Sequence, residues 1–291
     1  MKKSLLHLLL SAAPLFAGTP APVPQASSEP VGAEHGWTLD LEALYLRSFQ
    51  GSNSFTDKSY DFAGRAALGY QFNDGLFTKV TYFGYQPGDR NDTFEGFSDD
   101  LDGNAVFNER FNLKVSYLDW TVGQNFKPTA ALTLSPSLGL RWATFEETFS
   151  EHVDDGGGGV HQHYEQAKFE GLGLVAGLDA VRSLGNGFSL YGTAKASIIF
   201  GKDHYSRNEE MIMDGMASDG IQVNNSDDHV VAITELGLGA QYDFSFYNIT
   251  ANVRAGVEGQ YWTGLGNSHS EMSLAVNNGI AGFVLGANFR F

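Results

Sequence analysis

Apolar and polar residues alternate with a period of two over unusually long segments of this chain. In residues 60–72, Phe62, Leu68 and Phe72 share one face of the pattern, whereas Arg65 and Gln71 lie on the other. Such alternation is typical of a β-strand with one apolar face. Soluble strands usually have about five or six residues, whereas a tilted strand that crosses a bilayer needs about 9–11. The pattern therefore favours membrane-spanning strands.

Ten segments carry this alternation, and their connections are long and short in turn. The predicted strands are residues 37–48, 60–72, 76–86, 110–125, 132–142, 168–182, 188–200, 229–243, 248–262 and 280–291. Short turns, such as Asn-Asp-Gly at 73–75, alternate with polar loops of about 11 to 28 residues. Short periplasmic turns opposite long extracellular loops are typical of outer-membrane barrels. The count would rise to twelve if residues 87–109 contained a hairpin.

The fourth predicted strand keeps this pattern only if its phase shifts. A β-bulge at Tyr117 and Leu118 would place Asp119 beside Lys114 on the polar face, with Leu113 and Val115 on the apolar face. We therefore expect a bulge at this position.

A soluble sandwich is the main alternative for so many amphipathic strands. Strand length argues against it, as do charges of both signs on the polar faces. Aromatic residues also gather near the predicted strand ends, where the interfacial girdles of a membrane barrel belong; they are Trp37, Tyr45, Tyr70, Tyr82, Trp120, Trp142, Tyr191, Tyr261 and Trp262. An open sheet edge in lipid would leave backbone groups unpaired. We therefore predict an all-β fold: a closed, antiparallel, up-and-down transmembrane β-barrel.

The amino-terminal segment predicts export. Lys2 and Lys3 precede an apolar stretch of about a dozen residues, as in a secretory signal peptide. We expect residues 1–17 to be the signal peptide, residues 18–36 a linker rich in Pro, Ala and Ser, and residues 37–291 the barrel. No later segment has 18 consecutive apolar residues, which excludes a helical membrane protein. The expected location is the outer membrane of a Gram-negative-type bacterium.

Charge and cysteine content exclude several functions. The formal net charge is −16, so nucleic acid is not an expected partner. The absence of cysteine excludes disulfides, thiolate metal sites and a cysteine nucleophile. No cofactor is predicted.

Charged residues on the polar faces would point into the barrel. We predict that seven acidic and seven basic residues line the lumen: Asp40, Glu42, Asp61, Asp119, Glu170, Glu235, Glu258, Arg65, Lys79, Lys114, Arg141, Arg182, Lys195 and Arg254. Ion pairs among them would either line a narrow channel or fill a closed barrel, because ten strands lie close to the size at which side chains fill the interior.

Three predicted extracellular loops, residues 87–109, 146–167 and 201–228, are strongly acidic. At the mouth of a pore they would favour cations; otherwise they keep the surface solvated. Residues 99–104 resemble part of a calcium loop but lack its full pattern, and His152, His161 and His163 are a weak candidate for a transition-metal site. We therefore predict no metal site.

The carboxyl terminus carries an alternating apolar pattern that ends on an aromatic residue. Phe283, Leu285, Phe289 and Phe291 resemble the signal that the barrel assembly machinery recognises. Lipid, lipopolysaccharide and small ions or solutes are the other expected partners, and self-association into a homo-oligomer is left open.

Several motifs resemble the Legionella-type pore-forming outer-membrane protein family. They are residues 44–47, 138–142, 169–173, 177–179, 187–192, 199–201 and 253–262, and the last (Val-Arg-Ala-Gly-Val-Glu-Gly-Gln-Tyr-Trp) is the most distinctive. Val257 departs from the family, which has Tyr there. The resemblance spans about residues 37–291 and implies a pore-forming barrel.

Function is therefore expected to be porin-like passive diffusion of ions or small solutes, with weak cation preference. The alternative is a closed structural or adhesin-type barrel that acts through its acidic extracellular loops. An enzyme is not expected: carboxylates and histidines near the barrel rim are what acidic loops would contain by chance, and no Gly-x-Ser-x-Gly motif is present.

Overall fold

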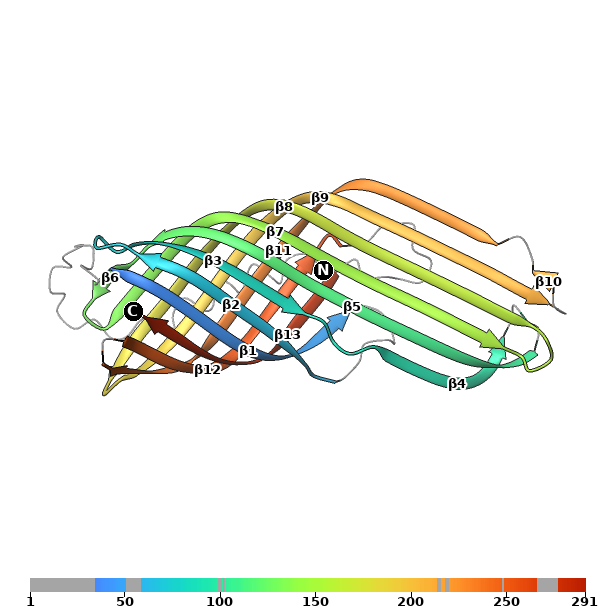
Figure 1. Ribbon diagram of the computed structural model, residues 1–291, viewed down its shortest axis with the longest axis horizontal. Helices are drawn as coiled ribbons and strands as arrows, with labels where there is room; N and C mark the ends of the chain where they lie inside the picture. The colour runs from blue at the N-terminus through green and yellow to red at the C-terminus, as the bar shows by residue number, and fades with distance from the viewer. Residues whose placement is uncertain are drawn as a thin grey trace, which may run out of the picture.

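Thirteen β-strands, all paired antiparallel, make up the computed structural model of the protein (Figure 1). The structure describes residues 35–50, 59–98, 101, 103–213, 216–217, 220–247, 249–265 and 277–291. No helix within these ranges is long and apolar enough to cross a membrane. The predicted signal peptide and almost all of the predicted linker lie outside the described residues.

Ten of the strands close into a barrel, as the sequence predicted. In chain order they are β1 (Gly36–Gln50), β2 (Asp61–Gln71), β3 (Leu76–Tyr85), β5 (Gly103–Gln124), β7 (Leu132–Asp154), β8 (Val160–Gly185), β9 (Phe188–Met213), β11 (Ile221–Phe246), β12 (Ile249–Thr263) and β13 (Asn277–Arg290). β1 pairs with β13, and β5 pairs with β7 to complete the ring. The up-and-down barrel is confirmed.

Three short strands lie off this ring: β4 (Arg90–Ser98), β6 (Phe126–Thr129) and β10 (Met216–Ala217). β4 forms a hairpin with the beginning of β5. This is the segment, residues 87–109, for which the sequence analysis named a hairpin as an alternative. Within the described residues β4 pairs only with β5, so this hairpin adds no strand to the ring.

The two ends of the barrel differ. One end carries the short turns and both ends of the described ring, where the Trp37 amide donates to the Phe291 carbonyl oxygen at 2.9 Å. The tight β8–β9 turn lies there too, and Gly185, Asn186 and Gly187 all have positive φ, which glycine and asparagine tolerate best. We call this the turn end.

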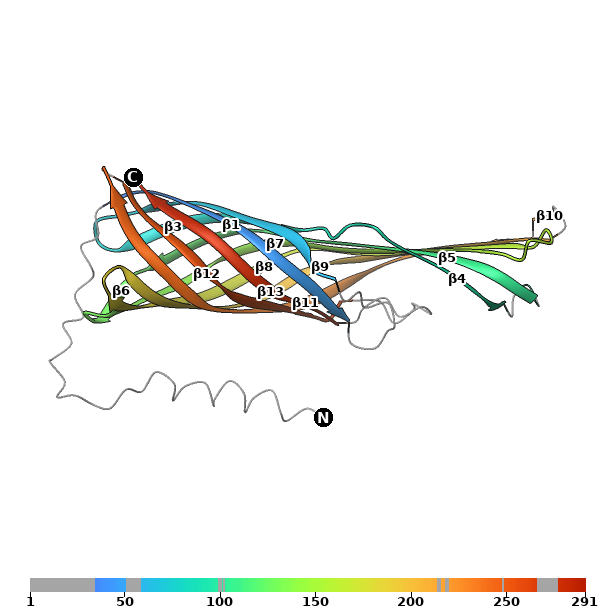
Figure 2. The ribbon, with the colours of Figure 1, turned by 90° about the horizontal axis from the view of Figure 1, so that it is seen from below.

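At the opposite end, five strands continue past the barrel as a flat sheet (Figure 2). We call this sheet the extension; it comprises β4 and residues 103–114, 145–154, 160–169, 202–213 and 221–229 of β5, β7, β8, β9 and β11. The prediction of long irregular loops here was wrong. Polar residues occupy both faces of these strands, and buried Phe149, Val153 and Tyr205 lie among them on the inner face.

The predicted bulge in β5 is also wrong. The β5–β7 register runs without a shift from Val106 opposite Asp154 to Gly123 opposite Ser137. Tyr117 is therefore buried on the inner face, and Leu118 is exposed on the outer face. The sequence pattern misled because the apolar residues of this strand change faces: they lie on the inner face up to Tyr117 and on the outer face from Leu118 onward.

An apolar belt surrounds the outside of the barrel. Its boundary towards the extension is the row Leu118, Trp142, Leu172, Phe200 and Val230, which are cross-strand partners and all exposed. Most of the predicted girdle aromatics lie on this outer surface; Trp37, Tyr45, Tyr82, Trp120, Trp142 and Tyr261 are exposed, and Tyr70 packs against Trp37. The predicted assembly-signal residues Phe283, Leu285 and Phe291 are exposed as well, with Phe289 partly so.

Candidate functional site

Eleven of the fourteen charged residues that the sequence assigned to the lumen lie on the inner face. They are Asp40, Glu42, Asp61, Arg65, Lys79, Asp119, Arg141, Lys195, Glu235, Arg254 and Glu258. Ten of them gather in the half of the barrel nearer the turn end. Asp61 lies at the other end of β2, opposite the buried Leu46.

The other three, Lys114, Glu170 and Arg182, lie on the outer face, which corrects the prediction. Lys114 and Glu170 stand just beyond the apolar belt, where Lys114 pairs with Glu146 and Glu170 with Lys168. Arg182 is opposite the exposed Leu190 at the turn end. Each of the three lies on the outer face of its strand, at or beyond the edge of the lipid-facing stretch. Charged side chains there are solvated by water, so the outer face need not be apolar and the sequence alternation no longer distinguishes the outer face from the inner one.

One wall of the lumen holds a buried ion-pair network around Arg141. Its guanidinium donates two hydrogen bonds to Asp119, at 2.6 and 2.7 Å, and lies 2.5 Å from a Glu235 oxygen. Tyr117 donates to the same Glu235 carboxylate at 2.9 Å, and the Lys195 ammonium is 3.6 Å from Asp119. Arg141 is 0% exposed. A guanidinium buried to this degree needs both carboxylates to compensate for its lost hydration.

The opposite wall holds a second network around Arg65. This side chain donates to Glu42 at 2.6 Å and forms a bidentate pair with Glu258 at 2.7 and 2.8 Å. Arg254 also pairs with Glu42, and its guanidinium lies over the ring of Tyr191. These contacts join β1, β2 and β12 across the barrel.

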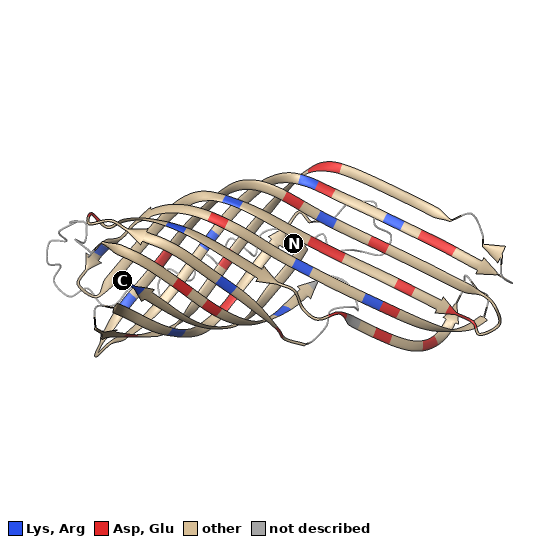
Figure 3. Cartoon of the chain, viewed as in Figure 1, with Lys and Arg blue, Asp and Glu red and all other residues tan. Residues whose placement is uncertain are grey.

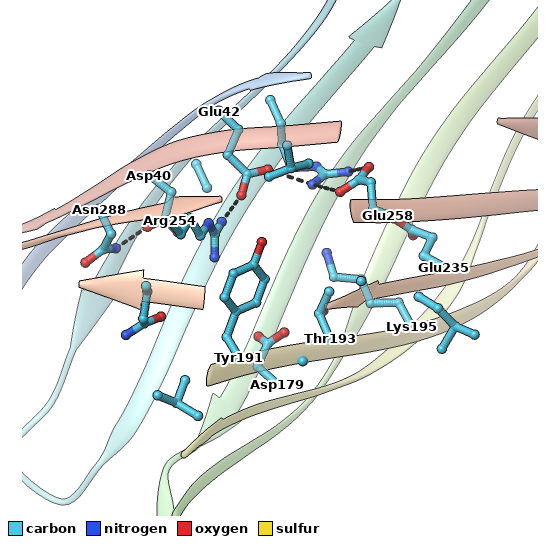
Figure 4. Close-up of a pocket in the computed structure, with 18 of the residues that line it drawn as sticks. Asp40, Glu42, Asp179, Tyr191, Thr193, Lys195, Glu235, Arg254, Glu258 and Asn288 are labelled. Atoms are coloured by element: carbon cyan, nitrogen blue, oxygen red, sulfur yellow. Dashed lines mark hydrogen bonds and ion pairs between the residues drawn. The ribbon is translucent and has the colours of Figure 1, made fainter. Parts of the chain in front are cut away.

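A polar cavity of about 280 Å³ lies between the two networks (Figure 4). Its lining includes Tyr191, Thr193 and Asp179, which the sequence reading did not assign to the lumen. Tyr191 was predicted to be a girdle aromatic, but it points inward beside Arg254. A second cavity of about 320 Å³ lies nearer the turn end. Lys79 and Asp40 line both this cavity and the first one. The sequence could have shown that Tyr191 faces inward, because it lies four residues before the inward-facing Lys195 and residues an even number apart share one face of a strand.

An apolar layer fills the other half of the lumen, beyond these networks, and continues into the base of the extension at Phe111, Leu113, Phe145 and Phe169. It consists of Leu44, Leu46, Phe83, Tyr85, Phe111, Leu113, Val115, Tyr117, Ala143, Phe145, Phe169, Ile199, Val231, Ile233, Trp262, Leu265, Ile280 and Val284, with Ala63 packed against it. All ten ring strands contribute to this layer.

Several large side chains of the apolar layer are completely buried. Phe83, Leu113, Ile199, Ile233 and Trp262 are each 0% exposed. Phe83 stacks on Tyr117 with ring centroids 5.0 Å apart. Burying each large apolar side chain contributes about 1.5–3 kcal/mol to stability. Trp262 was predicted to be a girdle aromatic and is instead part of this layer. The sequence signal for the layer was the alternating row Phe111, Leu113, Val115 and Tyr117, because the apolar row of this strand changes to the other face at Leu118.

Acidic residues concentrate on the extension (Figure 3). On its inner face, His161 and Arg207 both contact Glu209, at 3.1 and 2.6 Å. Nearby, Tyr205 donates to the fully buried Glu165 at 2.7 Å. Burial alone would raise the pKa of Glu165, but hydrogen bonds from His163 and Tyr205 lower it instead. Within the described residues, no group of histidines and acids could hold a metal ion. Half of the calcium-like segment 99–104, residues 99, 100 and 102, lies outside them.

Glu109 makes the extension sensitive to pH. Burial and the facing carboxylates of Glu151 and Asp92 raise its pKa from 4.5 to about 7. A raised carboxyl pKa favours folding below its unfolded value, and that contribution is lost as the pH rises through about 7. Substituting Glu109→Gln should therefore stabilise the protein at pH 8 by about 1 kcal/mol, allowing for solvent screening, and should change little at pH 4.

Urea unfolding at pH 4 and pH 8 measures this difference. Glu210→Gln, on the opposite face of the extension, is the matched control and should show no such pH dependence. Equal effects of Glu109→Gln at both pH values would contradict the carboxylate repulsion.

Comparison with known proteins gives one family. A family model described as the Legionella pneumophila major outer membrane protein precursor matches residues 30–291. No curated protein matches the chain.

Solved outer-membrane proteins resemble the chain more distantly. A major outer membrane protein from Thermus thermophilus is 14% identical, with a TM-score of 0.41 over 89% of this chain and 100% of that one. The outer membrane protease OmpT from Escherichia coli is 11% identical, with a TM-score of 0.47 over 88% and 97%. The attachment invasion locus protein Ail of Yersinia pestis is 13% identical, with a TM-score of 0.32 over 88% and 99%. Likeness this distant says nothing of function.

Proposed function

The chain belongs to the family of the Legionella pneumophila major outer membrane protein, and we propose that it is a closed, non-enzymatic outer-membrane barrel that acts through its extension. The apolar layer carries this proposal. Side chains from all ten ring strands meet inside the barrel, and several of them are completely buried. Ions would have to leave water to cross such a layer, and burying an unpaired ion is very costly.

If the lumen is closed, the extension is the part of the described structure that can contact other molecules outside the membrane. Short turns mark the periplasmic end of an outer-membrane barrel, so the extension lies outside the cell. β8, β9 and β11 each have 26 residues, far more than about 9–11 that a bilayer crossing needs. Continuous strand pairing holds this sheet rigid and above the membrane, as an adhesin-type surface requires.

A narrow ion pathway is the second candidate. The polar cavities of about 280 and 320 Å³ favour it, because they open the turn-end half of the lumen to charged solutes. The acidic extension would then give weak cation preference. Conduction would require the apolar layer to move, so current across a bilayer separates the two candidates.

Removing the centre of the extension tests the adhesin-type function. We expect a variant with residues 147–167 replaced by Asn-Gly to fold and insert normally, because Glu146 and Lys168 are cross-strand partners that a two-residue turn can join. Bacteria that display it should lose attachment to surfaces that cells with the unmodified protein bind, measured by counting retained cells.

The control exchanges the turn-end segment 185–187 for another short turn, which leaves the extension intact. Retained attachment of the variant without residues 147–167 would contradict the proposed function, provided that equal amounts of both proteins reach the surface.

A further inference from the structure

A shallow groove of about 310 Å³ crosses the outer face of the extension. Four strands supply its lining: β5 gives Asn108, β7 gives Ser150, Glu151 and His152, β8 gives Gln162, His163 and Tyr164, and β9 gives Asn208 and Glu210. Tyr164 is the cross-strand partner of both Ser150 and Asn208, and Gln162 is the partner of Glu210. Because neighbouring strands lie about 4.8 Å apart, polar groups repeat at that interval across the groove.

The lining has the chemistry that neutral sugars require. Asn108, Gln162 and Asn208 carry primary amides, which both donate and accept hydrogen bonds, as sugar hydroxyl groups do. Thr93 donates to the Asn108 side-chain oxygen at 2.9 Å and fixes the orientation of that amide. Tyr164 is 39% exposed and offers a flat ring on which the C–H face of a sugar can stack. Tyrosine with amide and hydroxyl groups also forms the adaptable surfaces of many binding sites.

Other ligand classes fit the groove poorly. Among the described residues that line it, none is Lys or Arg, and the two carboxylates of Glu151 and Glu210 stand beside His152 and His163, so phosphate and sulfate are disfavoured. Tyr164 is its only large apolar side chain, so it offers no pocket for the anchors of a hydrophobic peptide. The acyl chains of the membrane also lie far below. Leu172 at the belt boundary is eight residues from Tyr164 along β8, or about 26 Å.

We propose that this groove binds a neutral oligosaccharide. The inference rests on the proposed function, because it names the ligand class that the extension would recognise. The groove faces sideways, parallel to the membrane plane, since it lies on the face that continues the outer wall of the barrel. Two sources of such sugar reach that height: glycans on another surface, and the oligosaccharides of neighbouring glycolipids in the same outer membrane.

Binding of the purified, detergent-solubilised full chain to an array of neutral oligosaccharides tests the proposal for external sugars. The oligosaccharide released by mild acid from the outer-membrane lipid of the same cells tests the other source. We expect Tyr164→Ala to lower binding at least about tenfold and Asn208→Ala about fivefold. Tyr164→Phe should bind as the unmodified protein does, because the ring is kept.

Asn224→Ala is the matched control. Asn224, on β11, is exposed on the same outer face of the extension as the groove but does not line it. Unchanged binding of Tyr164→Ala, or equal losses for Asn208→Ala and Asn224→Ala, would overturn the proposed site. If neither sugar source binds while attachment still requires residues 147–167, the sugar proposal fails and the proposed function stands. If attachment does not require those residues either, both fail.

Discussion

Replacing Arg141 with methionine is expected to lower the free energy of unfolding by about 3–5 kcal/mol. Arg141 is 0% exposed and pairs with both Asp119 and Glu235. Without the guanidinium, two carboxylates would stay buried in the lumen with Lys195 beside Asp119 and Arg65 near Glu235 as the neighbouring cations. Breaking a buried ion pair by removing one partner is costly because the remaining charge is left uncompensated.

Reversible urea unfolding in lipid vesicles, followed by tryptophan fluorescence, measures this cost. Arg182→Met is the matched control, because Arg182 is exposed at the turn end and its loss should cost less than about 1 kcal/mol. The triple variant Asp119→Leu, Arg141→Met and Glu235→Leu should recover most of the stability, since apolar residues can replace a whole buried network. A cost below about 1 kcal/mol for Arg141→Met alone would show that water reaches these carboxylates.

Removing two rings from the apolar layer is expected to open the barrel to ions. Phe83 and Trp262 are both completely buried within it, and Trp262 packs against Phe145 with ring centroids 6.0 Å apart. The double variant Phe83→Ala and Trp262→Ala removes both rings and would join the polar cavities below to the extension above. A wet lumen would then conduct, and we expect discrete current steps in planar bilayers where the unmodified protein gives none.

The matched control removes the same two residue types from the outer surface. Phe62 and Trp142 are exposed to lipid, so the double variant Phe62→Ala and Trp142→Ala should give no current steps in the bilayer. Heat-dependent migration on gels verifies that both double variants fold. A folded Phe83→Ala and Trp262→Ala variant without current would contradict the apolar layer as the barrier.

Strand alternation was enough to predict the barrel and most of the charged residues inside it. Arg141 was assigned to the lumen because it lies between two lipid-facing residues, Leu140 and Trp142. Within the membrane, the outer face must be apolar, so a charged residue at an alternate position has only the inner face available.

The rule that charged residues in the alternation face inward fails outside the membrane, because the outer face of a strand need not be apolar there. Lys114 and Glu170 lie just beyond the apolar belt, where both faces accept charge, and the sequence placed them inside by continuing the alternation. The apolar layer was missed for the converse reason. Leu113, Val115 and Tyr117 are apolar, which a lipid-facing position would also require, and only their packing against other strands shows that they face inward.

Acidic segments were the other source of error. Residues 146–167 contain so many polar residues that they predict a solvated loop, yet β7 and β8 pair through the entire segment except at its short turn. Outside the membrane both faces of a sheet can be polar, so hydropathy alone does not distinguish such strands from loops. The paired strands of the extension therefore hold 13 of the 34 acidic residues, which they display at fixed spacing.

Current through a planar bilayer that contains the purified, unmodified protein is the most direct test of the closed lumen. The protein should be added at rising concentration, with the Phe83→Ala and Trp262→Ala variant as the reference for an open barrel. We predict that the unmodified protein gives no discrete steps above the bare bilayer, because the apolar layer excludes water across the full width of the barrel. Reproducible steps of uniform size, with a reversal potential set by a salt gradient, would contradict this account.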